Sequence, residues 1–190
     1  EVLGRDYDGS VKVRHFLEVL LEDVGLDTIG NWVKYPLNGL KVACYYGCLL
    51  VRPPEVTKFD DPENPVSLDH LVTELGAESL DWPYKVECCG GGLSMSRTDV
   101  VLKLTDLIVG MAQAAGADCI AVSCPMCQIN LDMRQLDIKK EIGKSYDMPI
   151  VYITQLLGLC LGIAPDKLGF NKLMISPSSV IEKVAVNKYG

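Results

Sequence analysis

The chain has 190 residues with 48% hydrophobic and 23% charged content, and its net charge is −7. These totals fit one soluble globular domain with a full core, and the acidic balance argues against a nucleic-acid partner. No apolar run approaches the roughly 18 residues of a membrane-spanning helix, and the first residues do not form a signal peptide, so we expect a cytoplasmic protein with no direct membrane span.

The first predicted element is an amphipathic helix over residues 10–25. Its apolar residues recur at helical spacing, Ser10 is a plausible N-cap, and Gly25 is a plausible end. His15 falls on the polar face of this helix, where we expect a solvated side chain. A buried strand is predicted next, over residues 40–46.

The rest of the chain is predicted to alternate between helices and strands. In order, these are a helix over 67–76, a strand over 84–89, a long helix over 98–115, a strand over 118–124 and a helix that begins at Pro125. They are followed by a strand over 149–153, a short helix over 154–162 and a helix near 180–186. His70 lies beside polar residues in the first of these helices, and we expect it to be exposed.

Strands that alternate with helices indicate right-handed crossovers and a parallel sheet. We therefore expect an α/β fold with an open, mainly parallel four-stranded sheet and helices on both faces, similar to a Rossmann fold. In such sheets, ligands bind beyond the carboxyl ends of the strands.

Five of the eight cysteines fall at or just after predicted strand ends, on what should be one edge of the sheet. They are Cys48, Cys88, Cys89, Cys124 and Cys127. The last two form a CxxC pair at a helix N-terminus, whose partial positive charge favours thiolate over thiol. The glycines at 90–92 allow a sharp turn that aims both neighbouring thiols one way, with backbone N–H groups close to sulfur.

The remaining three cysteines are predicted to be structural. Cys119 and Cys160 lie in apolar runs, where buried cysteines behave as small hydrophobes. Cys44 lies inside the first predicted strand, and there we favour burial over a role in the site.

The number of converging thiols bears on the metal. Structural zinc takes four ligands, and a standard iron–sulfur cubane takes four cysteines. Five thiols either leave one spare or hold an unusual iron–sulfur cluster. No histidine or obvious carboxylate joins them, which favours iron–sulfur and leaves a zinc-binding module as the minor alternative.

The segments around these cysteines resemble a known family. The segments are YYGCLLVRP, ECCGGGLSMS, AVSCPMCQINLDMRQ and PIVYITQLLGL. A cysteine after the first strand, then Cys-Cys-Gly, then CxxC, is similar to the CCG cysteine-rich domain family. The quoted segments most resemble the C-terminal half of the B subunit of heterodisulfide reductase, and the likeness covers nearly the whole chain.

This resemblance implies an oxidoreductase acting on sulfur groups. Its cofactor would be a noncubane iron–sulfur cluster, made of two fused smaller clusters, on Cys48, Cys88, Cys89, Cys124 and Cys127. In the family, the heterodisulfide of coenzyme M and coenzyme B is reduced between two such clusters, and electrons enter through a ferredoxin-like partner subunit with ordinary 4Fe–4S clusters. Arg52 and Arg97 are candidates to meet anionic groups of such a small-molecule disulfide, although solvated charges are equally expected there.

The chain contains one Cys-Cys-Gly, whereas full-length members of the family carry two such domains. Residues 1–39 resemble the segment that joins the two halves. We therefore expect a helical linker over 1–39, the CCG domain over 40–190 and a missing N-terminal CCG half. Alone, the chain should hold a cluster without completing the shared active site.

Two other functions remain open. The CCG motif also occurs in electron-transfer subunits of other enzymes, such as lactate, glycolate or glycerol-3-phosphate dehydrogenases, and quinone-linked fumarate or succinate enzymes. In that case the substrate would bind elsewhere. The other possibility is the zinc-binding module, which would use four of the five thiols.

Overall fold

The computed structural model describes residues 4, 6 and 8–189. Its sheet has four strands in the order β2-β1-β3-β4, and every neighbouring pair is parallel. The strands are β1 (Lys41–Tyr45), β2 (Glu78–Ser79), β3 (Cys119–Val122) and β4 (Ile150–Tyr152). The predicted α/β fold with an open, four-stranded parallel sheet is confirmed.

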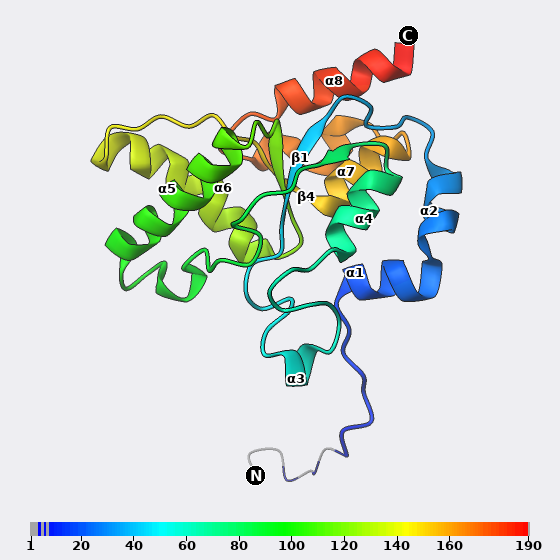
Figure 1. Ribbon diagram of the computed structural model, residues 1–190, viewed down its shortest axis with the longest axis horizontal. Helices are drawn as coiled ribbons and strands as arrows, with labels where there is room; N and C mark the ends of the chain where they lie inside the picture. Colours follow the sequence, from blue (N-terminus) through cyan, green and yellow to red (C-terminus); the bar gives the residue numbers. More distant parts are fainter. Residues whose placement is uncertain (1–3, 5, 7, 190) are drawn as a thin grey trace.

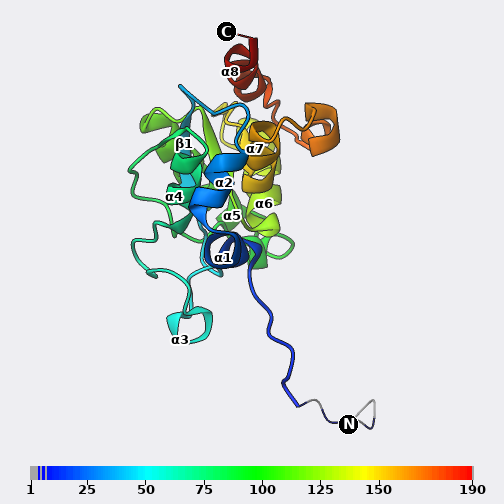
Figure 2. The same ribbon diagram turned by 90° about the vertical axis from the view of Figure 1, so that its right-hand side faces the viewer.

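Eight α-helices surround the sheet in the part of the chain that the structure describes. They are α1 (Phe16–Val19), α2 (Leu26–Trp32), α3 (Pro54–Thr57), α4 (Ser67–Glu74), α5 (Thr98–Ala114), α6 (Pro125–Glu141), α7 (Ile153–Cys160) and α8 (Ser178–Tyr189). In Figure 1, α5 and α6 lie on one side of the sheet and α4 and α7 on the other. Figure 2 shows α1 and α2 on the same side as α4 and α7. Helix α8 lies across the end where the strands begin, and Lys183 pairs there with Asp118 at 2.6 Å.

Both faces of the sheet are buried because helices cover each of them. On β1, Val42 and Cys44 pack into the core beneath α4 and α7, whereas Ala43 and Tyr45 pack into the core beneath α5 and α6. All four side chains are fully buried. This explains why the strands read as continuous apolar runs instead of alternating patterns.

The second strand does not lie where the sequence predicts it. Strand β2 pairs with the start of β1, and residues 84–89 form no strand. Pro83 lacks a backbone N–H and restricts the residue before it, so it disfavours continuing the ladder. The chain leaves the sheet before Pro83 and crosses over the carboxyl end of β1 instead.

The N-terminal helix is shorter than predicted and is interrupted. Helix α1 begins at Phe16, with His15 in place of Ser10 as its N-cap, and it continues as a π-helical turn over Leu20–Val24. Gly25 ends that turn at φ +85°, and α2 follows directly. The segment packs onto the core beneath α4 and α7 through buried side chains of Leu17, Ile29 and Leu37.

Candidate functional site

The five cysteines of the predicted site lie together beyond the carboxyl ends of β1 and β3. Cys48 Sγ is 4.0 Å from Cys88 Sγ, and Cys89 Sγ is 3.6 Å from Cys127 Sγ. The Cys127 thiol also hydrogen-bonds Cys124. The two neighbouring cysteines therefore face different partners, Cys88 toward Cys48 and Cys89 toward Cys127.

Backbone hydrogen bonds hold the segment with the adjacent cysteine pair over the end of β1. The Lys85 carbonyl accepts the N–H groups of Tyr46 (2.8 Å) and Gly47 (3.2 Å). The Glu87 carbonyl accepts the Tyr45 hydroxyl at 2.6 Å. These bonds replace the strand ladder that was predicted for this segment, and they bring the thiols to the same edge of the sheet.

A buried polar network anchors the same segment through a side chain. Lys85 Nζ lies 2.8 Å from Asp69 Oδ1 of α4, and both side chains are nearly enclosed. Asp69 also accepts the hydroxyl groups of Tyr46 (2.5 Å) and Ser79 (2.7 Å). The Asp69 carboxylate thus accepts hydrogen bonds from hydroxyl groups as well as from Lys85. Because this buried network is well satisfied, it holds Lys85 and Asp69 in fixed positions.

Two glycines are required by the close packing around the thiols. Gly47 has φ +65°, and a Cβ there would lie 2.8 Å from Cys127 Sγ. Gly90 has φ +77°, and a Cβ there would meet side chains of α5 at 3.1 Å. The Gly90 N–H lies 3.3 Å from Cys88 Sγ. The expected sharp turn is thus made at Gly90, and the next two glycines begin a 3-10 turn at ordinary backbone angles.

The N-terminus of α6 favours a thiolate at Cys124. The Cys127 thiol donates to Cys124, and so do the backbone N–H groups of Cys127 and Met126, which together lower the pKa of Cys124 to about 5. The pKa of Cys127 is raised, because its proton is shared with Cys124 and Cys89. Hydrogen bonding from Cys127 lowers the pKa of Cys89. The site therefore favours a thiolate at Cys124.

The structure places the other three cysteines elsewhere. Cys44, Cys119 and Cys160 are fully buried in the core beneath α4 and α7, whereas Cys89 and Cys127 lie in the core beneath α5 and α6. Burial raises the pKa of all three thiols, that of Cys160 to about 12. The predicted burial of these three cysteines is confirmed.

His15 is not the solvated residue that the sequence predicts. Its ring is half-buried, with Nε2 3.1 Å from the Ser123 carbonyl and Nδ1 accepting the N–H of Leu17 at 3.2 Å. Because a carbonyl only accepts, Nε2 carries the proton and the ring is neutral. Burial lowers the pKa of His15 in the same sense. His15 thereby ties the N-terminal segment to the residue before Cys124.

The two arginines considered as anion-binding candidates both form ion pairs. Arg52 pairs with Glu63 and Arg97 pairs with Asp99, each at 2.9 Å. These pairs face solvent, so they restrain the arginines only weakly. His70 is exposed, as predicted.

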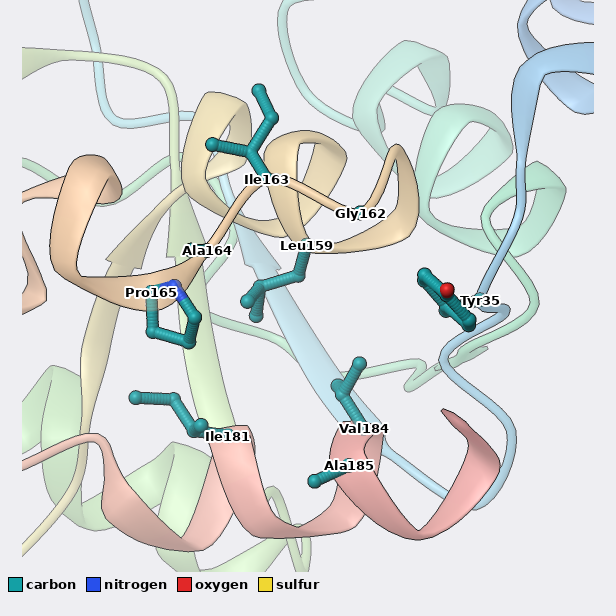
Figure 3. A pocket seen from close by; sticks show the side chains of 9 residues that line it. All are labelled: Tyr35, Leu159, Gly162, Ile163, Ala164, Pro165, Ile181, Val184 and Ala185. Atoms are coloured by element: carbon teal, nitrogen blue, oxygen red, sulfur yellow. The ribbon is translucent and has the colours of Figure 1, made fainter. Parts of the chain in front are cut away.

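Two pockets differ in what they offer a ligand. One, of about 320 Å³, opens beside Cys124 and is lined by His15 and Glu18 together with apolar side chains. The other, of about 230 Å³, lies between α7 and α8, with Tyr35 at one end (Figure 3). Its lining is Tyr35, Leu159, Gly162, Ile163, Ala164, Pro165, Ile181, Val184 and Ala185. Of these two, only the first has a thiol, that of Cys124, in its lining.

Cys48 and Cys88 form a pair, and Cys127 contacts both Cys89 and Cys124. Among residues 4, 6 and 8–189, no three His, Cys, Asp or Glu side chains are grouped so as to hold one metal ion.

Within the same residues, no helix is long and apolar enough to cross a membrane.

Comparison with known proteins identifies the domain around the thiols. Residues 42–132 match the family described as the CCG cysteine-rich domain. This span includes β3, all but the first residue of β1, and all five cysteines of the site.

Curated relatives extend the similarity to nearly the whole chain. The B subunit of the ferredoxin/F420H2-dependent CoB-CoM heterodisulfide reductase of Methanosarcina acetivorans is 35% identical over 96% of this chain and 61% of its own length. A protein of Archaeoglobus profundus that is named as similar to the heterodisulfide reductase B subunit is 34% identical over 98% of this chain and 63% of its own length. The 8-methylmenaquinol:fumarate reductase membrane anchor subunit of Wolinella succinogenes is 33% identical over 92% of this chain and 61% of its own length.

The chain thus spans about 61% of the length of the first of these relatives. Together, the cysteine arrangement, the matching domain and these relatives lead to one assignment. Residues 42–132 form a CCG cysteine-rich domain, and the chain is homologous to the B subunit of heterodisulfide reductase over about 61% of the length of that protein.

Proposed function

We propose that this chain is the cluster-binding domain of an oxidoreductase similar to the B subunit of heterodisulfide reductase. A noncubane iron–sulfur cluster, made of two fused smaller clusters, would be held by Cys48, Cys88, Cys89, Cys124 and Cys127. The observation that carries the proposal is the gathering of five thiols at one sheet edge, with sulfur separations of 3.6 and 4.0 Å in two pairs.

The donor set suits iron–sulfur chemistry, because such clusters are held by thiolates. The pKa of Cys48 is raised, first by burial and then by the charge of Cys88 beside it. A bound metal would offset this rise in the pKa of Cys48, since a metal favours the deprotonated thiol. The hydroxyl of Ser123, the residue before Cys124, is buried without a hydrogen-bond partner among the described residues. It leaves a donor for a group bound nearby.

A cluster bound here would supply electrons one at a time. The proposed overall reaction breaks the S–S bond of a small disulfide, such as the coenzyme M–coenzyme B heterodisulfide. Two electrons from a reduced iron–sulfur partner protein and two protons are taken up, and two thiols leave. This chain's residues hold the sulfurs in place, keep water away from buried Cys89 and Cys127, and offer the pocket beside Cys124 to a small molecule.

The rim of the cysteine site is apolar and open to solvent. Leu49 and Met126, which adjoin Cys48 and Cys127 in the chain, are 74% and 49% exposed. Exposed apolar side chains gathered around a site are typical of a surface that another protein covers. We propose that the N-terminal CCG half covers this surface. The relatives are longer than this chain, which spans about 61% of the first of them.

Anaerobic reconstitution with iron and sulfide tests the cluster assignment. The expected result is a coloured protein that carries iron and acid-labile sulfide and shows broad visible absorption. A colourless protein with zinc as its metal would favour the zinc-binding module instead.

A second candidate is an electron-transfer component of a quinone-linked enzyme. The observation in its favour is the 33% identity to the Wolinella succinogenes fumarate reductase subunit. The two candidates differ in which substrate oxidises the reduced full-length protein. A small disulfide should reoxidise it under the first proposal, whereas only a quinone-linked partner should do so under the second.

A further inference from the structure

A line of polar side chains leads from the surface of α6 to Cys89. Asn130, one turn after Cys127 on the same helix, is 2% exposed. Its Nδ2 donates to the Cys89 carbonyl (3.0 Å) and lies 3.8 Å from Cys89 Sγ. Its Oδ1 is 2.8 Å from the Ser94 hydroxyl. Arg134 Nη2 in turn donates to the Ser94 hydroxyl and carbonyl oxygens, at 3.0 Å each.

The chemistry of these groups fixes the direction of every bond. The Cys89 carbonyl only accepts, so the amide NH₂ of Asn130 must face it. The Asn130 oxygen then faces Ser94 and only accepts, so the Ser94 hydroxyl donates to it. Arg134 only donates. All donors therefore point from Arg134 toward Cys89, and in a buried setting each bond strengthens the next.

We propose that Asn130, backed by Ser94 and Arg134, is a positioning residue that holds Cys89 and raises the electron affinity of the cluster bound to it. This inference rests on the proposed function. A donor aimed at a cluster sulfur stabilises the reduced state, which carries more negative charge. The guanidinium at the outer end of the line acts in the same sense, although Asp137 offsets part of its charge at 2.7 Å.

The same helix offers a matched control. Gln135 is 1% exposed, and its Nε2 donates to the carbonyls of Leu131 and Met148 at 2.9 Å each. Its Oε1 accepts the Met148 N–H at 3.1 Å. Gln135→Leu removes a buried amide, as Asn130→Leu does. The side chain of Gln135 hydrogen-bonds to Leu131 and Met148, neither of which is a cysteine. Both variants should therefore lose stability, but only Asn130→Leu should change the reduction potential of the cluster.

The experiment compares the wild-type chain with Asn130→Leu, Ser94→Ala and Gln135→Leu after anaerobic reconstitution. Iron content, thermal midpoint and cluster reduction potential are measured, the last by redox titration followed through visible absorption. We expect Asn130→Leu and, by a smaller amount, Ser94→Ala to shift the potential in the negative direction. Gln135→Leu should lower the thermal midpoint and leave the potential at the wild-type value.

Equal potentials in the wild type, Asn130→Leu and Ser94→Ala would overturn this assignment while leaving the proposed function intact, since the cluster would still be present. A wild-type chain that binds no iron would overturn both. If Asn130→Leu does not fold, Ser94→Ala decides alone, because Ser94 is only half-buried. A more negative potential in that variant then supports the assignment, and an unchanged one overturns it.

Discussion

Gly47 shows how closely single residues are fitted to the thiols, because a Cβ at this position would lie 2.8 Å from Cys127 Sγ. We predict that Gly47→Ala lowers the affinity for iron by about 10-fold or more, the scale on which disturbed ligand surroundings act. Iron retained after gel filtration of the anaerobically reconstituted protein measures this. Gly92→Ala is the control, since Gly92 has an ordinary φ and no described atom lies within 4 Å of its added Cβ. Equal iron loss in both variants would contradict the prediction.

The buried cysteines outside the site provide a second prediction for single residues. Cys119 and Cys160 lie in the core beneath α4 and α7 and are fully buried. Replacing either by Ala should leave iron content nearly unchanged and cost only the small loss of packing expected when a buried sulfur is removed. Iron analysis and thermal unfolding separate the two effects. A Cys119→Ala variant without iron would show that this thiol belongs to the site.

The segment that carries Cys88 and Cys89 depends on its tie to helix α4. We predict that Asp69→Ala lowers the free energy of unfolding by about 3–5 kcal/mol, because it leaves the buried Lys85 ammonium without a counterion. Urea denaturation measures this change. Glu63→Ala, which breaks the exposed pair with Arg52, should cost less than about 1 kcal/mol. Similar losses in the two variants would mean that the buried pair has no special role.

The sequence predicts well those elements that begin at a characteristic residue or that have apolar residues at a regular spacing. Pro125 marks the start of α6, and apolar residues at helical spacing predict α5. Residues 84–89 look like a strand because apolar residues such as Val86 alternate with polar residues along this part of the sequence. Their actual anchors are two N–H groups on the Lys85 carbonyl and a buried ion pair, which no local pattern reveals.

The cysteine site could be predicted for a different reason. Residues that follow parallel strands meet at the same sheet edge whatever the details of the loops, so the grouping of Cys48 with Cys124 and Cys127 follows from the fold class. His15 could not be placed in this way, because its partner Ser123 lies 108 residues away in the chain. Such a contact depends on how the N-terminal segment packs, and spacing within a helix carries no information about that.

For the whole molecule, we predict that residues 1–190 alone bind iron but reduce little or no heterodisulfide. The sequence has one Cys-Cys-Gly, the chain spans about 61% of its relatives' length, and the rim around the thiols is exposed and apolar. The proposed reaction needs a second cluster facing the first. An anaerobic assay with reduced viologen and heterodisulfide measures turnover. Turnover as fast as that of a full-length relative would show that one cluster suffices.

The most direct test of the central claim is the iron and acid-labile sulfide content of the reconstituted chain and of five single variants. These replace Cys48, Cys88, Cys89, Cys124 and Cys127 by Ser, one at a time, with Cys160→Ser as the control. The predicted result is that the wild type and the control carry iron and sulfide, and that each of the five variants loses most of both. A wild-type chain that binds only zinc, or a Cys88→Ser variant with the full wild-type iron content, would contradict the assignment.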